Sequence, residues 1–381
     1  MKTLLLSSLL VLPTIVGCVI KDSTGTEPQQ QETNGTLSTY TESAKADNQG
    51  LANIKVEVND HRSFLVTAEK GQGVDYVSVE QVLAPNGKEV LNWEDWYNGK
   101  ESLTYAFYAD VDTVLNYPIR KDEGALQNGT YTVVVGAYKE QGGGLYYAPS
   151  GGVDVTVHRR KDSEPNSGSV KAVVIYAKGL SNNDTVTTGV KDAVAYWKQI
   201  WGNKNLELTV RYESSDISTD LPFPGYGDGQ SIIQASNMAD GDEIVVIIGE
   251  SIDGDSRSYL GVSGNIPGTL IPTTRSATVI SWLANAGQDG KFSEEDITLF
   301  GETLAHEVGH YVGLFHPVED GWGFWDAIDD TDRCTSRNQC ESALGSNLMF
   351  PYPVCSFSDC VAQNDLTSGQ QAVMQRYTGT K

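Results

Sequence analysis

The sequence is poor in basic residues. Its 381 residues include 27 lysines and arginines against 50 aspartates and glutamates, so the formal net charge is −23 at pH 7. Because such a chain repels phosphates, we exclude nucleic acid as a partner and attribute the acidity to solubility outside the cell. Beyond residue 16, no apolar run approaches the roughly twenty residues that a membrane-spanning helix needs. We therefore expect no transmembrane segment in the mature protein.

Cysteine is scarce as well, with five in the chain and none between Cys18 and Cys334. The remaining four all lie near the C-terminus: Cys334, Cys340, Cys355 and Cys360. An even set in an exported protein predicts two disulfides, and the sequence alone cannot choose among the three possible pairings. A four-cysteine zinc site is the alternative. It is disfavoured because the spacings are CxxxxxC and CxxxxC rather than CxxC.

Histidine is equally rare, yet three of the five histidines fall within His306–His316, which reads HExxHxxGxxH. Two histidines four residues apart on a helix point the same way and can hold one metal ion. Gly313 can adopt a left-handed turn that returns His316 as a third ligand. Three imidazoles with one open position describe a catalytic zinc site, and Glu307 beside the first ligand can deprotonate a water that the metal activates.

The surrounding residues predict a helix for this motif. Ser293 and Asp296 form a candidate capping box at its start. Apolar residues then recur at three- and four-residue steps, which predicts one buried face: Ile297, Phe300, Leu304, Val308 and Tyr311. Since His306 and His310 lie off that stripe, the helix can pack on one side and present the ligands to a cleft on the other.

The extended motif resembles the signature of the metzincin metallopeptidases, which also carry a methionine-containing turn beneath the zinc. Met349, in Asn347–Pro351, fits that turn. The resemblance implies zinc ligation by His306, His310 and His316, with Glu307 as the general base. Within the clan, the chain resembles the pappalysin-like bacterial enzymes. The resemblance is carried by the late cysteines, the acidic run at 329–332 and the segment 366–370.

Two further features bear on that resemblance. Several clan members place a tyrosine two residues after the methionine, where it can approach the zinc. This chain has Pro351 at that position and Tyr352 one residue later. Tyr352 is therefore a candidate zinc-proximal or oxyanion residue, displaced by one position from the clan pattern. Structural Ca²⁺ is a second candidate cofactor, although solvated acidic loops explain the same residues equally well and none has EF-hand spacing. The loop carboxylates that suggest it are Asp253, Asp255, Asp326, Asp329, Asp330 and Asp332.

The N-terminus has the features of an exported lipoprotein. Lys2 precedes an apolar run over 4–16 that is too short to span a membrane. Residues 15–18 resemble a lipobox, which implies cleavage after residue 17 and lipidation of Cys18; an ordinary cleaved signal is the alternative. We therefore expect a bacterial envelope location, anchored to the outer membrane or cell surface by lipid, or release from it.

Composition divides the remaining chain. Residues 18–50 are polar and predict a flexible tether. Residues 51–160 carry short alternating strands separated by turn signals, which predict an all-β sandwich, immunoglobulin-like in architecture. Residues 161–168 form a polar linker. The predicted strands of the sandwich include Ile54–Val58, Val77–Val82, Thr130–Val135 and Val153–Val157.

Residues 169–381 predict an α+β domain, a twisted mixed sheet with the metal-binding helix. Glu243–Gly249 is apolar on both faces and is expected at the centre of the sheet. Trp197 and Trp201 are expected in the core on a long helix. Ala277–Trp282 precedes the metal-binding helix, where metzincins have an antiparallel edge strand that pairs with an extended substrate.

The combined reading is a secreted, lipid-anchored zinc endopeptidase acting on protein or peptide substrates. One alternative is a surface binding or adhesion protein that uses a metallopeptidase scaffold. A zinc amidase acting on cell-wall peptides is another. Glu307 favours an enzyme, because a scaffold has no chemical need for a base beside the metal.

Overall fold

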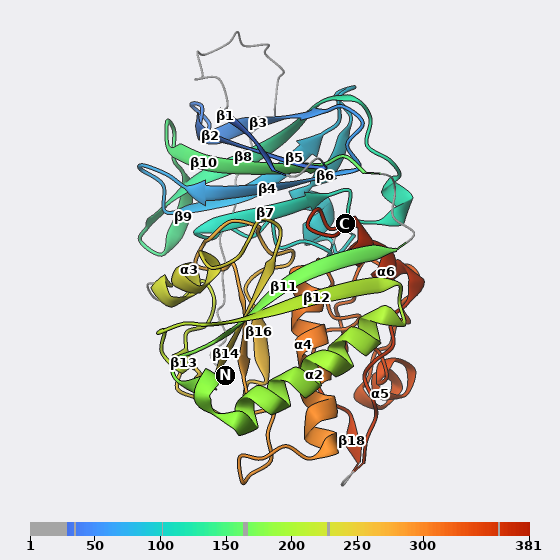
Figure 1. Cartoon of the computed structure of the whole chain (residues 1–381). Helices are drawn as coiled ribbons and strands as arrows, with labels where there is room; N and C mark the ends of the chain where they lie inside the picture. Colours follow the sequence, from blue (N-terminus) through green and yellow to red (C-terminus); the bar gives the residue numbers. More distant parts are fainter. Residues whose placement is uncertain (1–28, 34–35, 101, 163–166, 227–228, 357–358) are drawn as a thin grey trace.

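The computed structural model describes residues 29–33, 36–100, 102–162, 167–226, 229–356 and 359–381. It has two parts, an all-β sandwich and a mixed α/β part below it (Figure 1). The predicted signal peptide and Cys18 lie outside the described residues. Among the helices of the described ranges, none is both long and apolar enough to cross a bilayer.

The sandwich consists of two antiparallel sheets. One has the order β1-β2-β10-β4-β7: β1 (Gln29–Thr33), β2 (Leu37–Lys45), β10 (Gly152–Arg160), β4 (Ser63–Lys70) and β7 (Asp112–Tyr117). The other has the order β3-β8-β5-β6, with β9 paired to β8: β3 (Leu51–Val58), β8 (Gly129–Gln141), β5 (Tyr76–Leu83), β6 (Glu89–Asn92) and β9 (Gly144–Tyr147). Two short helices connect strands: α1 (Trp93–Tyr97) and the 3₁₀ helix η1 (Lys121–Glu123).

Alternating side chains explain why these segments pair as sheets. In β3, every second residue from Ala52 to Val58 is buried, and the residues between them are exposed. Burying the apolar set of each sheet against the other forms a core without any disulfide. Each of the four strands predicted from alternation lies within β3, β5, β8 or β10. The immunoglobulin-like topology stays a prediction.

The prediction that residues 18–50 form a flexible tether is wrong where β1 and β2 lie, at Gln29–Thr33 and Leu37–Lys45. Strand β2 pairs with β10 from Leu37 opposite Arg160 to Lys45 opposite Gly152. Only Leu37 and Tyr40 are buried in β2. The strand is therefore held mainly by backbone hydrogen bonds to its neighbours, and its polar side chains resemble those of a linker.

The α/β part is built on a five-stranded sheet of order β12-β11-β14-β17-β16. Its strands are β12 (Leu206–Ser214), β11 (Gly168–Tyr176), β14 (Ile244–Gly249), β17 (Thr278–Ser281) and β16 (Gly261–Ser263). Every residue of β14 is buried, in agreement with the predicted central strand. The two long helices are α2 (Asp184–Gly202) and α4 (Glu294–Tyr311). They pack together so closely that a Cβ on Gly301 would lie 2.8 Å from the Ala193 oxygen.

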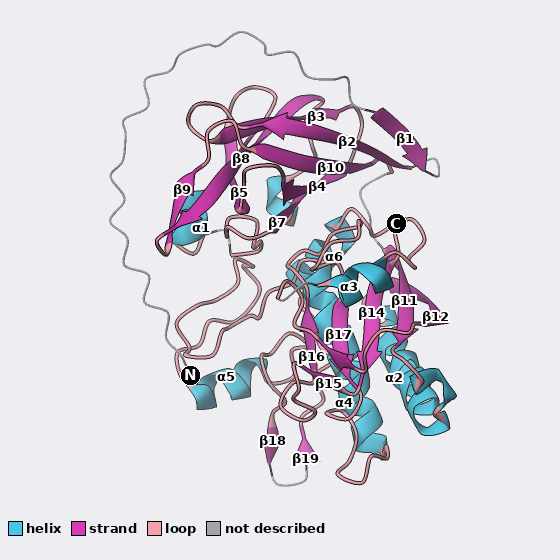
Figure 2. Ribbon diagram, turned by 90° about the vertical axis from the view of Figure 1, so that its left-hand side faces the viewer, coloured by secondary structure: helices cyan, strands magenta, loops and turns pink. Residues whose placement is uncertain are grey.

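Shorter elements complete this part. They are η2 (Leu180–Asn182), β13 (Asp220–Leu221), α3 (Gln230–Ser236), β15 (Ser251–Ile252), α5 (Arg337–Leu344), β18 (Cys355–Ser356), β19 (Asp359–Cys360) and α6 (Ser368–Arg376). Helices α5 and α6 and the hairpin β18–β19 follow α4 in a loop-rich region (Figure 2). As predicted, Trp197 and Trp201 are fully buried core residues on α2.

The antiparallel edge strand differs from the prediction. We expected it at Ala277–Trp282, but β17 in that segment runs parallel to β14. The edge is instead β16, which pairs antiparallel with β17. Because β16 has only three residues, GVS, no alternating pattern marks it in the sequence.

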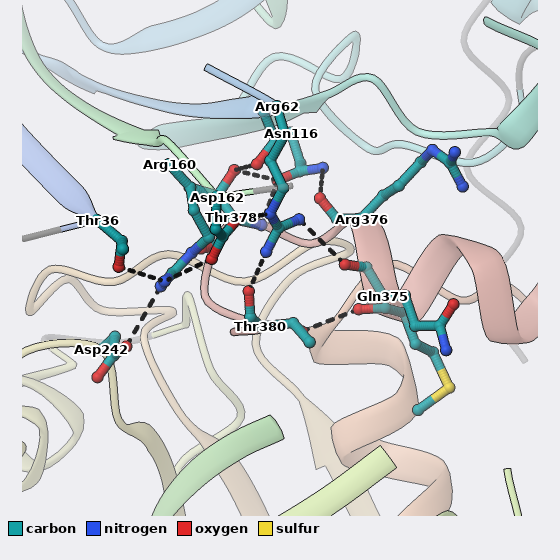
Figure 3. Close-up of polar contacts among 12 residues, drawn as sticks. Thr36, Arg62, Asn116, Arg160, Asp162, Asp242, Gln375, Arg376, Thr378 and Thr380 are labelled. Atoms are coloured by element: carbon teal, nitrogen blue, oxygen red, sulfur yellow. Dashed lines mark hydrogen bonds and ion pairs between the residues drawn. The ribbon is translucent and has the colours of Figure 1, made fainter. Parts of the chain in front are cut away.

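The C-terminal segment joins the two parts through buried hydrogen bonds (Figure 3). Arg160, at the end of β10, donates to the Thr378 carbonyl, and Arg62 donates to the carbonyls of Gln375 and Thr380. Asn116 on β7 accepts from the Thr378 amide at 2.8 Å. Buried guanidinium and amide groups of the sandwich thus pair with backbone groups of the α/β part, which we call the C-terminal half below.

Arg160→Met should strongly destabilise the protein. The Arg160 side chain is fully buried and lies 3.3 Å from the Asp242 carboxylate. Removing the guanidinium leaves the buried Thr378 carbonyl without this donor. It also takes one cation from Asp242, which Lys171 and Lys381 approach as well. We expect a loss of about 1–3 kcal/mol in the free energy of unfolding. Urea denaturation measures this loss.

The matched control Arg337→Met breaks an exposed pair with Glu341, so it should change the free energy of unfolding far less. Equal losses in the two variants would contradict the role of the interface.

A second interface group predicts a pH dependence of stability. Burial raises the pKa of Asp112 on β7 from 3.8 to about 6, against the opposing effects of the Thr273 hydroxyl and the Arg275 guanidinium. The folded protein therefore holds this proton more tightly than the unfolded chain, so Asp112 lowers stability as pH rises from 3.8 to 6. Asp112→Asn should raise the melting temperature above pH 6 and have little effect below pH 4. If Asp112→Asn shifts the melting temperature equally at every pH, the raised pKa of Asp112 is not the cause. The same holds if the exposed control Asp122→Asn gives the same pH-dependent shift.

Candidate metal centre

Helix α4 begins as predicted. The Ser293 hydroxyl accepts from the Asp296 amide at 3.1 Å, and the Asp296 carboxylate accepts from the Ser293 amide at 2.8 Å. This reciprocal pair is a capping box. Later in the helix, Phe300, Leu304 and Val308 are fully buried against the core. The helix is therefore fixed along one face, which sets the direction of the histidines on its other side.

The structure brings the three predicted histidines together. Helix α4 ends after Tyr311, and Gly313 has φ +109°, in the region that favours glycine. The chain turns there and returns His316 to the helix. The Nε2 atom of His316 then lies 3.2 Å from that of His310 and 3.3 Å from that of His306.

Each histidine is oriented through its other ring nitrogen. Nδ1 of His306 lies 2.7 Å from the Leu348 oxygen, and Nδ1 of His310 lies 2.6 Å from the Leu314 oxygen. Nδ1 of His316 lies 3.0 Å from the Glu319 carboxylate. Since these oxygens only accept, each Nδ1 carries the proton and each Nε2 presents a lone pair to the same point. Three lone pairs facing one another need a shared cation, so the donor set fits a metal ion.

Burial keeps the helical imidazoles neutral. It lowers the pKa of His306 to about 3 and that of His310 well below its ordinary value, with the neighbouring imidazoles acting in the same direction. A metal ligand must be a neutral imidazole, so the surroundings favour the ligating form.

Glu307 is half-buried beside the edge strand. Burial raises the pKa of its carboxyl to about 8, and the Ser263 amide opposes this by hydrogen bonding. A Cβ on Gly261 would lie 2.7 Å from Cγ of Glu307, so only glycine lets β16 pass this close. Glu307 and His306 both line a cleft of ≈ 270 Å³, whose wall includes Tyr259 and Pro353.

Met349 packs against α4 at Gly309, the residue before His310. It is fully buried, and a Cβ on Gly309 would lie 2.8 Å from its sulfur. Asn347 holds the turn by accepting from the Met349 amide at 2.9 Å. The preceding residue, Leu348, supplies the carbonyl that orients His306. The segment therefore acts on the ligands through its backbone as well as through the methionine.

Tyr352 lines the cleft but its hydroxyl points elsewhere. The hydroxyl donates to the Glu341 carboxylate of α5 at 3.1 Å, and the Arg337 guanidinium lies over the ring at 5.5 Å. This contact gives no support to a zinc-proximal or oxyanion role.

The four late cysteines form two disulfides, Cys334–Cys340 and Cys355–Cys360. This confirms the predicted disulfides and excludes the alternative four-cysteine zinc site. The three histidines are the one group of three or more potential ligand side chains that converges within the described residues. The acidic loops do not converge in this way, so structural calcium gains no support.

Sequence reasoning missed two contributors to the site. Glu319 orients His316, yet an acidic residue in a polar loop carries no signal of that role. Tyr105 belongs to the sandwich, and its ring centroid lies 5.0 Å from that of Phe315, beside the third histidine. Tyr105 and Phe315 are far apart in the sequence, so no local sequence pattern could predict that they meet.

His306→Ala, His310→Ala and His316→Ala should each lower the zinc content of the purified protein, because two imidazoles bind far more weakly than three. Metal analysis by mass spectrometry tests this. His61→Ala is the control, since His61 lies in the sandwich, where its Nδ1 accepts from the Asn59 amide. Undiminished zinc in all three variants would rule out this ligand set.

Comparisons with known proteins identify metalloproteases. No family model matches the chain. The chain is 23% identical over 223 residues to an extracellular metalloprotease of Neurospora crassa, a match covering 54% of this chain and 72% of that protein. It is 30% identical over 106 residues to an extracellular metalloprotease of Pyricularia oryzae, covering 26% of this chain. That match spans about a third of the relative's own length, 35%.

Two solved structures are also similar. Metalloproteinase-II of Bacteroides fragilis matches with a TM-score of 0.31 and 12% identity over 92% of this chain and 91% of its own. Myroilysin matches with a TM-score of 0.26 and 12% identity over 55% of this chain and 92% of its own. These TM-scores are too low to establish a shared fold. The sequence matches are the firmer finding: over about half of its length, 54%, the chain resembles an extracellular metalloprotease.

Proposed function

We propose that the protein is a zinc-dependent endopeptidase of the metzincin type, secreted and anchored by lipid at Cys18. The observation that carries the proposal is the convergence of three imidazoles beside the half-buried carboxylate of Glu307 in a cleft. Similarity to metalloproteases named extracellular supports both the activity and the location.

Zinc is the metal that this donor set suits best. Three histidine nitrogens form an open site of the catalytic kind, and no carboxylate belongs to the converging group. When bound, zinc supplies a Lewis acid that polarises the scissile carbonyl and acidifies water. The binding residues are His306, His310 and His316. Met349 forms an apolar floor beneath them.

Glu307 is the proposed general base and acid. It takes a proton from the attacking water and later delivers it to the leaving amine. Its place suits the task, since it lines the cleft next to His306 and is held by the Ser263 amide of the edge strand. A peptide aligned along that strand would carry its scissile bond past this carboxylate.

The edge strand supports peptide binding by strand addition. The Ser281 amide donates to the Leu260 carbonyl at 3.1 Å, so Leu260 belongs to a pair that is hydrogen-bonded within the sheet. The N–H and C=O of the next residue, Gly261, therefore face away from β17. An extended substrate can pair with these free groups, and the adjacent cleft can receive one of its side chains.

The pappalysin-like subtype is proposed from the disulfide-linked region and the residues around 329–332 and 366–370. One departure stands out. Tyr352 replaces the tyrosine that other clan members carry one position earlier, and its hydroxyl is bound to Glu341. We therefore assign the catalytic proton transfers to Glu307 alone.

Glu307→Gln should leave zinc bound and reduce peptide hydrolysis by about 10²–10⁴-fold, the usual contribution of a general base. The test pairs metal analysis with casein hydrolysis by the parent protein and the variant. The matched control Glu341→Gln changes a carboxylate that binds Tyr352 and is not proposed for proton transfer.

The possible outcomes separate the functions. Full activity in Glu307→Gln would show that Glu307 is not the general base. Zinc in both proteins with no hydrolysis of casein, but with hydrolysis of peptidoglycan peptides by the parent, would indicate a zinc amidase. Zinc in both proteins with no hydrolysis of either substrate would favour a binding protein.

A further inference from the structure

A loop of the sandwich lies against the segment that follows the edge strand β16 and against Phe315, the residue before His316. This 102–110 loop contacts three separate segments of the C-terminal half. The Tyr105 amide donates to the Ile266 carbonyl at 2.8 Å, and the Ser102 hydroxyl donates to the Trp325 carbonyl at 2.8 Å. Asp110 pairs with Arg275 at 2.8 Å. The loop is therefore fixed against the region next to the metal centre.

The sandwich holds the same loop from the other side. The Val79 amide of β5 donates to the Ala106 carbonyl at 2.7 Å, and the Thr113 hydroxyl of β7 donates to the same carbonyl at 2.8 Å. Leu103 and Phe107 are buried. The network of Figure 3 fixes the sandwich on the C-terminal half. The loop is therefore preorganised, which lowers the entropic cost of binding a ligand on it.

The loop presents aromatic rings to solvent. Tyr105 and Tyr108 are 40% and 55% exposed, and their ring centroids lie 5.5 Å apart. Trp96 packs on Tyr108 at 4.6 Å, and Tyr105 packs on Phe315 at 5.0 Å. We call this surface, Trp96, Tyr105, Tyr108 and Phe315, the aromatic shelf. It begins at the residue next to the metal ligand His316.

The shelf lies at one end of the path that a substrate would follow. On one side of Glu307, the cleft is lined by Tyr259, Leu260 and Gly261. On the other side, the chain continues from the last edge-strand residue, Ser263, to Ile266, where Tyr105 is bound. A peptide pairing antiparallel with β16 runs from the Ile266 end toward the Tyr259 end. Its residues N-terminal to the scissile bond therefore lie at the shelf.

We propose that the sandwich takes part in substrate selection, with Tyr105 and Tyr108 binding an apolar or aromatic side chain about three residues N-terminal to the scissile bond. The position is set by Ile266, which binds Tyr105 and lies three positions along the chain from Ser263, the last residue of the edge strand. Aromatic rings favour apolar and aromatic partners. This proposal rests on the peptidase function proposed above and adds a specificity determinant outside the C-terminal half.

The test uses the full chain and matched peptides that differ only in having Phe or Gly three residues upstream of the scissile bond. We expect kcat/KM to favour Phe by about tenfold in the wild type. In Tyr105→Ala and in Tyr108→Ala, the ratio of kcat/KM for the Phe peptide to that for the Gly peptide should fall to about 1–2. In Tyr105→Phe, which keeps the aromatic ring, this ratio should stay at its wild-type value. Preferences downstream of the scissile bond should not change. Tyr146→Ala, which removes an exposed tyrosine on β9, is the control.

The outcomes separate this proposal from the peptidase function. The role of the shelf is overturned if both alanine variants keep the wild-type preference for Phe upstream of the scissile bond. It is also overturned if kcat/KM falls equally for all peptides. In either case the peptidase function is unaffected. Equal cleavage by wild type and Glu307→Gln overturns the function itself. Fluorescence anisotropy on zinc-loaded Glu307→Gln gives a readout without turnover. There, the Phe peptide should bind more tightly than the Gly peptide, and adding Tyr105→Ala should abolish that difference; equal affinities for the two peptides overturn the proposal.

Discussion

The metal centre depends on three hydrogen bonds that set the imidazole tautomers. His306, His310 and His316 each use Nδ1 to contact an oxygen acceptor, which turns three Nε2 lone pairs toward one point. Two acceptors, the Leu314 carbonyl and Glu319, come from the chain that follows α4. The third comes from the methionine turn, which depends on the loop-rich region after it. The ligands therefore converge only when these C-terminal segments are folded. Loss of metal binding would accordingly accompany unfolding of that region.

A different constraint governs the junction with the sandwich. The contact is largely polar: buried arginines and Asn116 satisfy carbonyls and an amide of the last residues of the chain. Buried polar groups of this kind stabilise only when all of them are paired, and they fix geometry more narrowly than apolar contact does. The sandwich is thereby held in one orientation, and the Tyr105 amide of its 102–110 loop donates to the Ile266 carbonyl, just beyond the edge strand β16. This fixed contact is the basis of the role in substrate selection that we propose for the sandwich.

Much of the site was predictable because its signals are local. Ser293 and Asp296 are three residues apart, and the capping box needs nothing else. The helical spacing of His306 and His310 and the turn at Gly313 likewise depend on short-range geometry. Errors arose where pairing is decided by distant segments. Strand β2 has the composition of a linker, and β16 has only three residues, so each is recognisable only from the strand beside it.

The sequence by itself predicted that three histidines converge and that two disulfides form, because each follows from residue type and close spacing. The roles of Glu307 as a base and of Met349 in a methionine turn stay predictions from the same spacing. Only the tertiary structure decided the disulfide pairing, the acceptors on each Nδ1, the direction of the Tyr352 hydroxyl and the meeting of Tyr105 with Phe315. The physical reason is that these features join segments separated by loops. Their approach depends on how whole sheets and helices pack, and no short stretch of sequence encodes that packing.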